Sequence, residues 1–259
     1  MPIVDLDGEP FNLQVDGPAN APALLLSNSL SSDLTMWEPQ IPAWSKHFRI
    51  VRYDQRGHGR SVAPDGPYSI AQLADDALAV LDHLGIGQAD WCGLSMGGMV
   101  GMWVLTHRPE RIGRAVLANT AAHMGPRELW DGRIRTAERG GMAALVDATI
   151  ERWFTRRFIE SAPETIATVR RMILGTPAQG YIGSCAAIRD MDQRETIRAI
   201  ANPTLVLIGA HDPATTPADG QLIHQAIAGS RTATLDAAHI SNIEQPHAFT
   251  KAVMDFLVD

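Results

Sequence analysis

Short apolar runs alternate with helix-like patterns along the first 120 residues of the chain. Four of the runs are short enough to be buried strands, and they cover residues 21–27, 48–54, 89–94 and 113–120. Residues 69–86 instead repeat apolar side chains at three- and four-residue spacings, which predicts a helix with Ser69 as its N-cap. Strands and helices that alternate over short connections form a mostly parallel sheet covered by helices on both faces. The sequence therefore predicts the α/β class.

The alternation stops between residues 123 and 188. This segment shows helical patterns only and is rich in Arg and Trp, whereas strand patterns return at 203–210 and 231–237, each followed by a helix pattern. Residues 2–6 and 11–15 predict an antiparallel pair. We therefore expect an α/β core of residues 1–122 and 189–259, with an inserted all-helical cap of residues 123–188.

Charge and composition exclude several classes of function. The net charge of −7 argues against nucleic acid or an anionic membrane as a partner, although residues 123–188 are mildly basic, with nine Arg against seven acidic residues. The first residues have no basic start followed by an apolar run, and no stretch is long enough to span a membrane. Two lone cysteines, Cys92 and Cys185, suit a reducing compartment. They cannot form a metal cluster by themselves, and we expect a cytoplasmic protein without a metal site.

The segment "GLSMGG" at residues 93–98 lies where a predicted strand runs into a predicted helix. A sharp strand-to-helix bend needs small residues, and it exposes the side chain at its apex at the carboxyl edge of the sheet. Ser95 occupies that apex, so the context predicts a nucleophilic serine in a nucleophile elbow.

A serine hydroxyl needs a base, and the base needs an acid to orient it. Both should follow the serine, on loops after later strands, in the order acid and then histidine. His239 follows the last predicted strand, and Asp212 ends the preceding one, so we expect the triad Ser95, Asp212 and His239. Asp236 is the second choice for the acid, and His211 is a weaker candidate for the base.

Ester hydrolysis through a serine also needs about two backbone N–H donors for the oxyanion. One should come from the residue after the nucleophile, Met96. The other should come from the loop after the strand at 21–27, where we choose Leu30.

These segments together resemble the α/β-hydrolase family over essentially the whole chain. The resemblance rests on four segments, "YDQRGHGRS" (53–61), "GLSMGG" (93–98), "IGAHDPATTP" (208–217) and "AAHISNIEQP" (237–246). Most members carry His-Gly in the loop after the first parallel strand, where this chain has Asn28-Ser29. The resemblance implies an α/β-hydrolase fold with a Ser-Asp-His core under a helical cap.

Several segments are similar to those of one branch of the family, the 3-oxoadipate enol-lactonases. They are "SNSL" (27–30), "YDQRGHGRSVAPDGPYSI" (53–70), "CGLSMGGM" (92–99), "LANTA" (117–121), "CAAIRDMD" (185–192) and "HDPATTP" (211–217). The similarity implies cofactor-free hydrolysis of 3-oxoadipate enol-lactone to 3-oxoadipate, in the β-ketoadipate pathway of aromatic catabolism. The partner implied is a small anionic lactone.

An anionic lactone needs local positive charge, and Arg is suited to bidentate capture of a carboxylate. Trp130 and Arg133 share a helical face in the basic segment, and Trp153 could add an apolar wall. Arg189 is a further candidate, although it could equally pair with an adjacent acid. We interpret Arg56 and His58 as loop structure near the site.

Two other functions stay open at this point. The same triad would serve a broad-specificity carboxylesterase or a cofactor-free haloperoxidase-like hydrolase. A receptor with the hydrolase fold and slow turnover is a third possibility. Family members that use Asp as the nucleophile are disfavoured, because position 95 is Ser.

Overall fold

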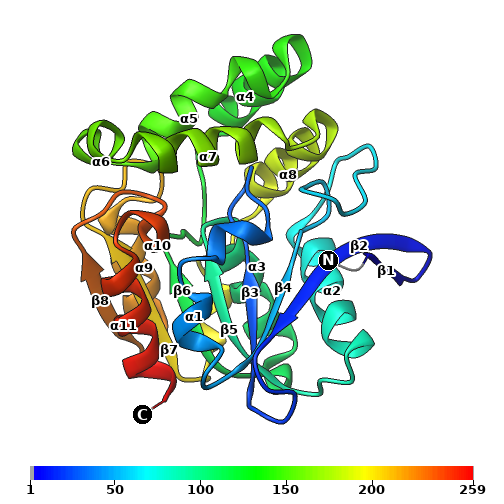
Figure 1. Ribbon diagram of the computed structural model, residues 1–259, viewed down its shortest axis with the longest axis vertical. Coiled ribbons are helices and arrows are strands. Elements are labelled where there is room, and N and C mark those ends of the chain that lie inside the picture. The colour runs from blue at the N-terminus through cyan, green and yellow to red at the C-terminus, as the bar shows by residue number, and fades with distance from the viewer. Residues whose placement is uncertain (1–2, 259) are drawn as a thin grey trace.

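The computed structural model describes residues 3–258, which form one eight-stranded sheet in the order β1-β2-β4-β3-β5-β6-β7-β8 (Figure 1). The strands are β1 (Ile3–Leu6), β2 (Glu9–Asp16), β3 (Ala23–Ser27), β4 (Arg49–Tyr53), β5 (Ala89–Leu94), β6 (Ile112–Ala118), β7 (Thr204–Gly209) and β8 (Arg231–Leu235). Strands β1 and β2 pair antiparallel, and β2 pairs antiparallel with β4. All neighbours from β4 to β8 pair in parallel. The predicted α/β class is confirmed.

Helices cover both faces of the sheet, which is why the inner strands are continuous apolar runs without polar alternation. On one face α3 (Met96–His107) packs against β5 and β6 and beside α2 (Ile70–His83). On the face toward the viewer in Figure 1, α1 (Ile41–Trp44) contacts α11 (Pro246–Leu257). The remaining core helices are α9 (Pro217–Ala226) and α10 (Ser241–Glu244), and short 3-10 helices lie at η1 (Leu34–Trp37), η2 (Pro109–Arg111) and η4 (Thr196–Ala199).

The helix predicted over 69–86 begins as expected and ends slightly early. The Ser69 side chain accepts a hydrogen bond from the Gln72 N–H at 3.1 Å and so caps α2. The helix ends at His83, because Gly85 adopts a φ of +66° and the Ile86 N–H bonds back to the Leu81 carbonyl at 2.9 Å.

Five helices lie between β6 and β7, and Figure 1 shows them together over one end of the sheet. They are α4 (Arg127–Gly140), α5 (Val146–Trp153), α6 (Arg156–Ser161), α7 (Pro163–Leu174) and α8 (Ala178–Asp190), with the short η3 (Met142–Ala144) between α4 and α5. Helix α8 extends two residues past the expected boundary at 188. The division into a core and a cap with the boundaries given above stays a prediction.

Both cysteines are buried and free, and Cys92 lies inside β5 as packing. Within residues 3–258, no helix combines the length and the apolar character that a membrane crossing requires.

Candidate active site

Ser95 sits at the turn between β5 and α3 in a strained backbone conformation. Its φ is 58° and its ψ is −117°, a region that few residues other than glycine adopt. The Ser95 N–H donates to the Ala118 carbonyl at 2.9 Å, and the Thr120 hydroxyl donates to the Ser95 carbonyl at 2.7 Å. The end of β6 therefore holds the bend in place.

The glycines around Ser95 are required by space. A Cβ on Gly97 would lie 2.0 Å from the Ser27 carbonyl oxygen, and a Cβ on Gly93 would lie 2.2 Å from the Gly97 carbonyl oxygen. Real side chains essentially never approach backbone atoms this closely. The bend thus brings β3, β5 and the start of α3 into backbone contact, which only glycine permits.

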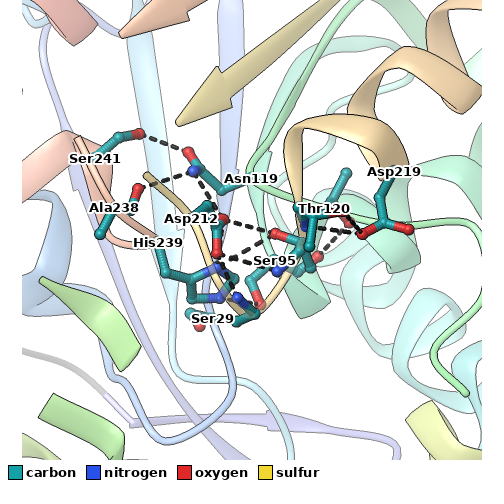
Figure 2. Close-up of polar contacts among 12 residues, drawn as sticks. Ser29, Ser95, Asn119, Thr120, Asp212, Asp219, Ala238, His239 and Ser241 are labelled. Carbon is teal, nitrogen blue, oxygen red and sulfur yellow. Dashed lines mark hydrogen bonds and ion pairs between the residues drawn. The ribbon is translucent and has the colours of Figure 1, made fainter. Parts of the chain in front are cut away.

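Ser95, His239 and Asp212 form one hydrogen-bonded chain (Figure 2). The His239 Nε2 lies 2.9 Å from the Ser95 Oγ, and the His239 Nδ1 lies 2.8 Å from the Asp212 Oδ2. All three residues are buried, with exposed fractions of 6%, 3% and 3% for Ser95, Asp212 and His239. With the Asp212 carboxylate accepting from Nδ1–H, the lone pair of Nε2 faces the serine hydroxyl. This is the geometry that proton abstraction from Ser95 needs.

The environment of Asp212 keeps its carboxylate ionised. Burial is the largest effect and raises the pKa of Asp212, but His239 and the side-chain hydrogen bonds outweigh it, so that the pKa is lowered overall. The carboxylate accepts from the Asn119 amide at 3.0 Å, from the Thr215 hydroxyl at 2.8 Å, and from the N–H groups of Ala214 and Thr215 at 2.8 and 3.0 Å.

Asn119 is a site residue to which the sequence analysis gave no role. Besides Asp212, its amide donates to the Ala238 carbonyl at 3.0 Å, and its Oδ1 accepts from the Ser241 hydroxyl at 2.6 Å (Figure 2). Asn119 therefore connects the acid to both sides of the loop that carries His239. The sequence signal that could have identified Asn119 is its position, as a polar residue directly after the apolar run of β6.

The alternative acid and base lie elsewhere. The Asp236 carboxylate bonds to the His211 ring at 2.7 Å and to the Arg157 guanidinium at 3.0 Å, and all three side chains are exposed. Neither Asp236 nor His211 is among the residues that line the cavity at Ser95.

A small cavity opens at Ser95 between the sheet edge and the overlying helices. Besides Ser95 and His239, four residues that the sequence analysis selected line this cavity, and they are Leu30, Trp130, Arg133 and Trp153. The full lining comprises Ser29, Leu30, Ser31, Ser95, Met99, Met124, Trp130, Arg133, Thr149, Arg152, Trp153, Tyr181, Ile188, Ala214, Thr215 and His239. The Arg133 guanidinium stacks over the Trp130 ring at 4.5 Å. Arg152 was not singled out by the sequence analysis.

The two backbone amides expected to hold an oxyanion are both free to donate. Neither the Leu30 nor the Met96 N–H has an acceptor among residues 3–258. Met96 is the first residue of α3, so its N–H is one of those that a helix leaves unpaired. Met96 itself is buried and does not line the cavity with its side chain.

The loop that carries Leu30 is held by side chains where related proteins have His-Gly. The Asn28 amide donates to the Tyr53 carbonyl at 2.7 Å, and its Oδ1 accepts from the Trp37 indole at 2.8 Å. The left-handed conformation of this loop falls on Ser31, with φ of 65°, and does not involve Ser29. The Asn28-Ser29 departure therefore introduces no backbone strain at Ser29.

His58 bonds this loop directly and Arg56 bonds His58, and neither residue lines the cavity at Ser95. The His58 Nδ1–H donates to the Arg56 carbonyl at 3.1 Å, and Nε2 accepts from the Ser31 N–H at 3.0 Å. Burial lowers the pKa of His58 to about 4. Arg56 is neutralised by Asp76 and Glu9.

Arg189 does not belong to the site. Its guanidinium pairs with Asp131 and Asp190, each at 2.8 Å, and it does not line the cavity at Ser95. Arg189 thus pairs with the adjacent Asp190, which is the alternative that the sequence left open.

The buried Glu244 carboxylate ties the loop of His239 to the helices above it. It accepts from the Ala238 N–H at 2.9 Å and from the Thr155 N–H at 3.3 Å, and it also bonds the Thr155 hydroxyl. In addition, the Ile240 N–H donates to the Trp153 carbonyl at 3.0 Å. The residues on either side of His239 are thus fixed to the segment between α5 and α6.

Comparison with known proteins establishes the family. The α/β hydrolase fold family matches residues 22–246, and the chain belongs to that family. Within it, the chain is 43% identical over 243 residues to 3-oxoadipate enol-lactonase 2 of Acinetobacter baylyi, covering 94% of this chain and 91% of that protein. It is 37% identical to 3-oxoadipate enol-lactonase 1 of the same organism, covering 98% and 96%. The crystal structure of the enol-lactonase from Burkholderia xenovorans superimposes with a TM-score of 0.98 over the full length of both chains, at 48% identity.

We predict that Gly97→Ala destabilises the protein. The added methyl group would collide with the Ser27 carbonyl, and such overpacking costs about 1–3 kcal/mol, so we expect a loss of that size in the free energy of unfolding. Urea unfolding measures it. Gly87→Ala is the matched control, because a Cβ there meets nothing within 4 Å. Equal unfolding midpoints for the two variants would contradict the crowding described for this bend.

We predict that burial of His58 makes the stability of the protein depend on pH. Because the pKa of His58 is lowered to about 4 in the native state, the unfolded chain binds a proton below about pH 6.5 that the native chain does not. Stability from this group is therefore lost as the pH falls from about 6.5 to 4, amounting to about 2 kcal/mol by pH 5.

His58→Gln isolates this effect, because Gln does not titrate. The variant should lose less stability than the parent between pH 7 and pH 5, measured by urea unfolding at both pH values. Identical losses in the two proteins would rule out a neutral buried His58.

Proposed function

We propose that the protein hydrolyses 3-oxoadipate enol-lactone to 3-oxoadipate through a serine acyl-enzyme. The observation that carries the proposal is a hydrogen-bonded Ser95–His239–Asp212 chain that faces a cavity containing an arginine without an acidic partner among the described residues. Near full-length similarity to two enol-lactonases and to an enol-lactonase structure supports the same activity. The reaction would belong to the β-ketoadipate pathway.

In the acylation step, His239 takes the proton of Ser95 as the serine Oγ bonds to the lactone carbonyl carbon. The N–H groups of Leu30 and Met96 hold the negative charge that develops on the carbonyl oxygen. Collapse of this intermediate breaks the ring C–O bond and expels an enolate. The enolate then takes the proton that His239 holds and becomes the ketone, and His239 is neutral again. An enolate is a better leaving group than an alkoxide, so proton donation from His239 matters less here than in the second step.

In the deacylation step, His239 takes a proton from water, and the resulting hydroxide attacks the acyl carbon. The Ser95 Oγ leaves, regains its proton from His239 and releases the new carboxylate. Asp212 stays ionised through both steps and stabilises the positive charge that His239 carries within each of them, while it holds a proton.

The free carboxylate of the substrate binds to the Arg133 guanidinium group. This guanidinium is held over Trp130 and lines the cavity, and Trp153 adds an apolar wall. A planar guanidinium can donate two parallel hydrogen bonds to a carboxylate. The site would therefore favour anionic lactones over neutral esters.

We also propose the expected division of the chain, with residues 123–188 as a cap over a core of residues 1–122 and 189–259. Its support is that α4 and α5 supply Trp130, Arg133 and Trp153 to the cavity at Ser95. A cytoplasmic location is supported by the two free cysteines.

The activity is tested with the purified protein, the enol-lactone and neutral p-nitrophenyl esters. We expect rapid loss of the lactone's ultraviolet absorbance and slow ester hydrolysis. Ser95→Ala and His239→Ala should each lower kcat by about four orders of magnitude or more, because the members of a triad act as a unit.

Other outcomes of this assay would favour the alternatives. Comparable rates on neutral esters would point to a broad carboxylesterase or a haloperoxidase-like hydrolase. Turnover of neither substrate would point to a receptor.

We predict that Arg133→Ala mainly raises KM for the anionic lactone. Loss of a hydrogen bond to a charged group costs about 1.5–3 kcal/mol, which corresponds to a rise of about 10- to 100-fold. Steady-state kinetics with the lactone measures the change. Arg139→Ala, an exposed arginine on the same helix, is the control and should leave KM unchanged. An unchanged KM for Arg133→Ala would remove Arg133 from the site.

A further inference from the structure

Two arginines, not one, line the cavity at Ser95. Arg133 comes from α4 and Arg152 from α5. Five other arginines on the helices between β6 and β7 form ion pairs with acidic side chains, and they are Arg127, Arg156, Arg157, Arg170 and Arg189. Across residues 3–258, neither Arg133 nor Arg152 has an acidic side chain within ion-pair distance. Among the described residues Arg135, Arg139 and Arg171 also form no ion pair, but they are exposed and do not line the cavity. Arg133 and Arg152 are thus the partly buried arginines of these helices that reach the site without a counter-charge.

The two guanidinium groups oppose each other electrostatically. Burial lowers the pKa of Arg152, and the positive charge of Arg133 lowers it further. Both groups nevertheless stay protonated, because arginine does not lose its proton in proteins. Two partly buried cations without a carboxylate are unfavourable in the protein alone, and a bound anion would relieve both the desolvation and the repulsion.

The Arg152 side chain is also held in position. Its Nη2 donates to the Thr149 hydroxyl at 3.1 Å, and that hydroxyl donates to the Leu145 carbonyl at 2.8 Å. The hydroxyl proton is therefore committed to the helix backbone, and its lone pair is directed at the guanidinium. One N–H group of Arg152 is used in this way, and the other donors are left for a ligand in the cavity.

We propose that Arg152 is a second carboxylate-binding residue and that the cavity holds the substrate's carboxylate between the guanidinium groups of Arg152 and Arg133. Two planar donors around one carboxylate can supply up to four charge-assisted hydrogen bonds. The identity of the substrate rests on the proposed function, whereas the anion site itself does not. Small dicarboxylates without a lactone ring, such as adipate, should bind there too.

Binding can be tested without turnover in Ser95→Ala protein. Adipate should raise its Tm, whereas sodium chloride at matched ionic strength should not. Adding Arg152→Gln should weaken adipate binding at least about tenfold, because the bonds to a charged group are lost. Arg152→Lys should retain part of the affinity, and Arg139→Gln, at an exposed site, should retain all of it.

A structural role for Arg152 predicts something different. If Arg152 only supported α5, Arg152→Gln would lower the Tm without ligand and leave the adipate affinity unchanged. We expect the reverse, with an unchanged or higher Tm without ligand, because the repulsion from Arg133 is removed. Equal adipate affinity with and without Arg152→Gln, or no effect of adipate on Ser95→Ala protein, would overturn the proposal.

Kinetics separates this proposal from the proposed function. With Ser95 intact, Arg152→Gln should lower kcat/KM for the anionic lactone by about 10- to 100-fold and that for p-nitrophenyl acetate by a much smaller factor, because the neutral ester has no carboxylate to bind. If the unaltered protein did not hydrolyse the lactone, the proposed function would fail, and adipate binding would still decide the anion site.

Discussion

The bend at Ser95 is the constraint on which the rest of the site depends. It requires β5 to enter α3 with the backbone of Gly97 against the Ser27 carbonyl of β3, in the middle of the sheet. The same bend places the Ser95 Oγ against His239 and leaves the Met96 N–H without a partner at the start of α3. The strained φ of Ser95 is tolerated because Ala118 of β6 bonds its N–H and Thr120, just after β6, bonds its carbonyl.

Charged side chains are balanced differently in the core and in the helices that lie between β6 and β7. In the core, Arg52 and Arg56 are buried and each is neutralised by two carboxylates. The Asp212 carboxylate is likewise fully hydrogen-bonded. In the overlying helices the two arginines that reach the cavity have no acidic partner among the described residues. Arg52, Arg56 and Asp212 are thus balanced by partners within the core, whereas Arg133 and Arg152 carry positive charge that an anionic substrate would balance.

The fold and the candidate triad were accessible from the sequence for a simple reason. In a parallel sheet all carboxyl ends meet at one edge, so Ser95, Asp212 and His239 could be placed together from their positions after three strands. The pairing of arginines was not accessible in this way. In the sequence, Arg152 does not differ from the other eight arginines of residues 123–188. Only the tertiary packing of α4 and α5 decides that Arg133 and Arg152 are the two of these arginines that line the cavity. Asn119 was overlooked because its partners are about 90 to 120 residues away in the chain.

By itself, the sequence determined the α/β class, the bend at Ser95 with its glycines, and the positions of Ser95, Asp212 and His239 after three strands, because these depend on local periodicity and on the polarity of strand ends. Tertiary structure alone decided that His58 supports the loop of Leu30, that Glu244 joins the His239 loop to the helices above it, and that Arg152 faces the site. The physical reason is that hydrogen bonds and ion pairs between distant segments depend on which surfaces pack together. That packing is set by the whole core and not by any short stretch of the chain.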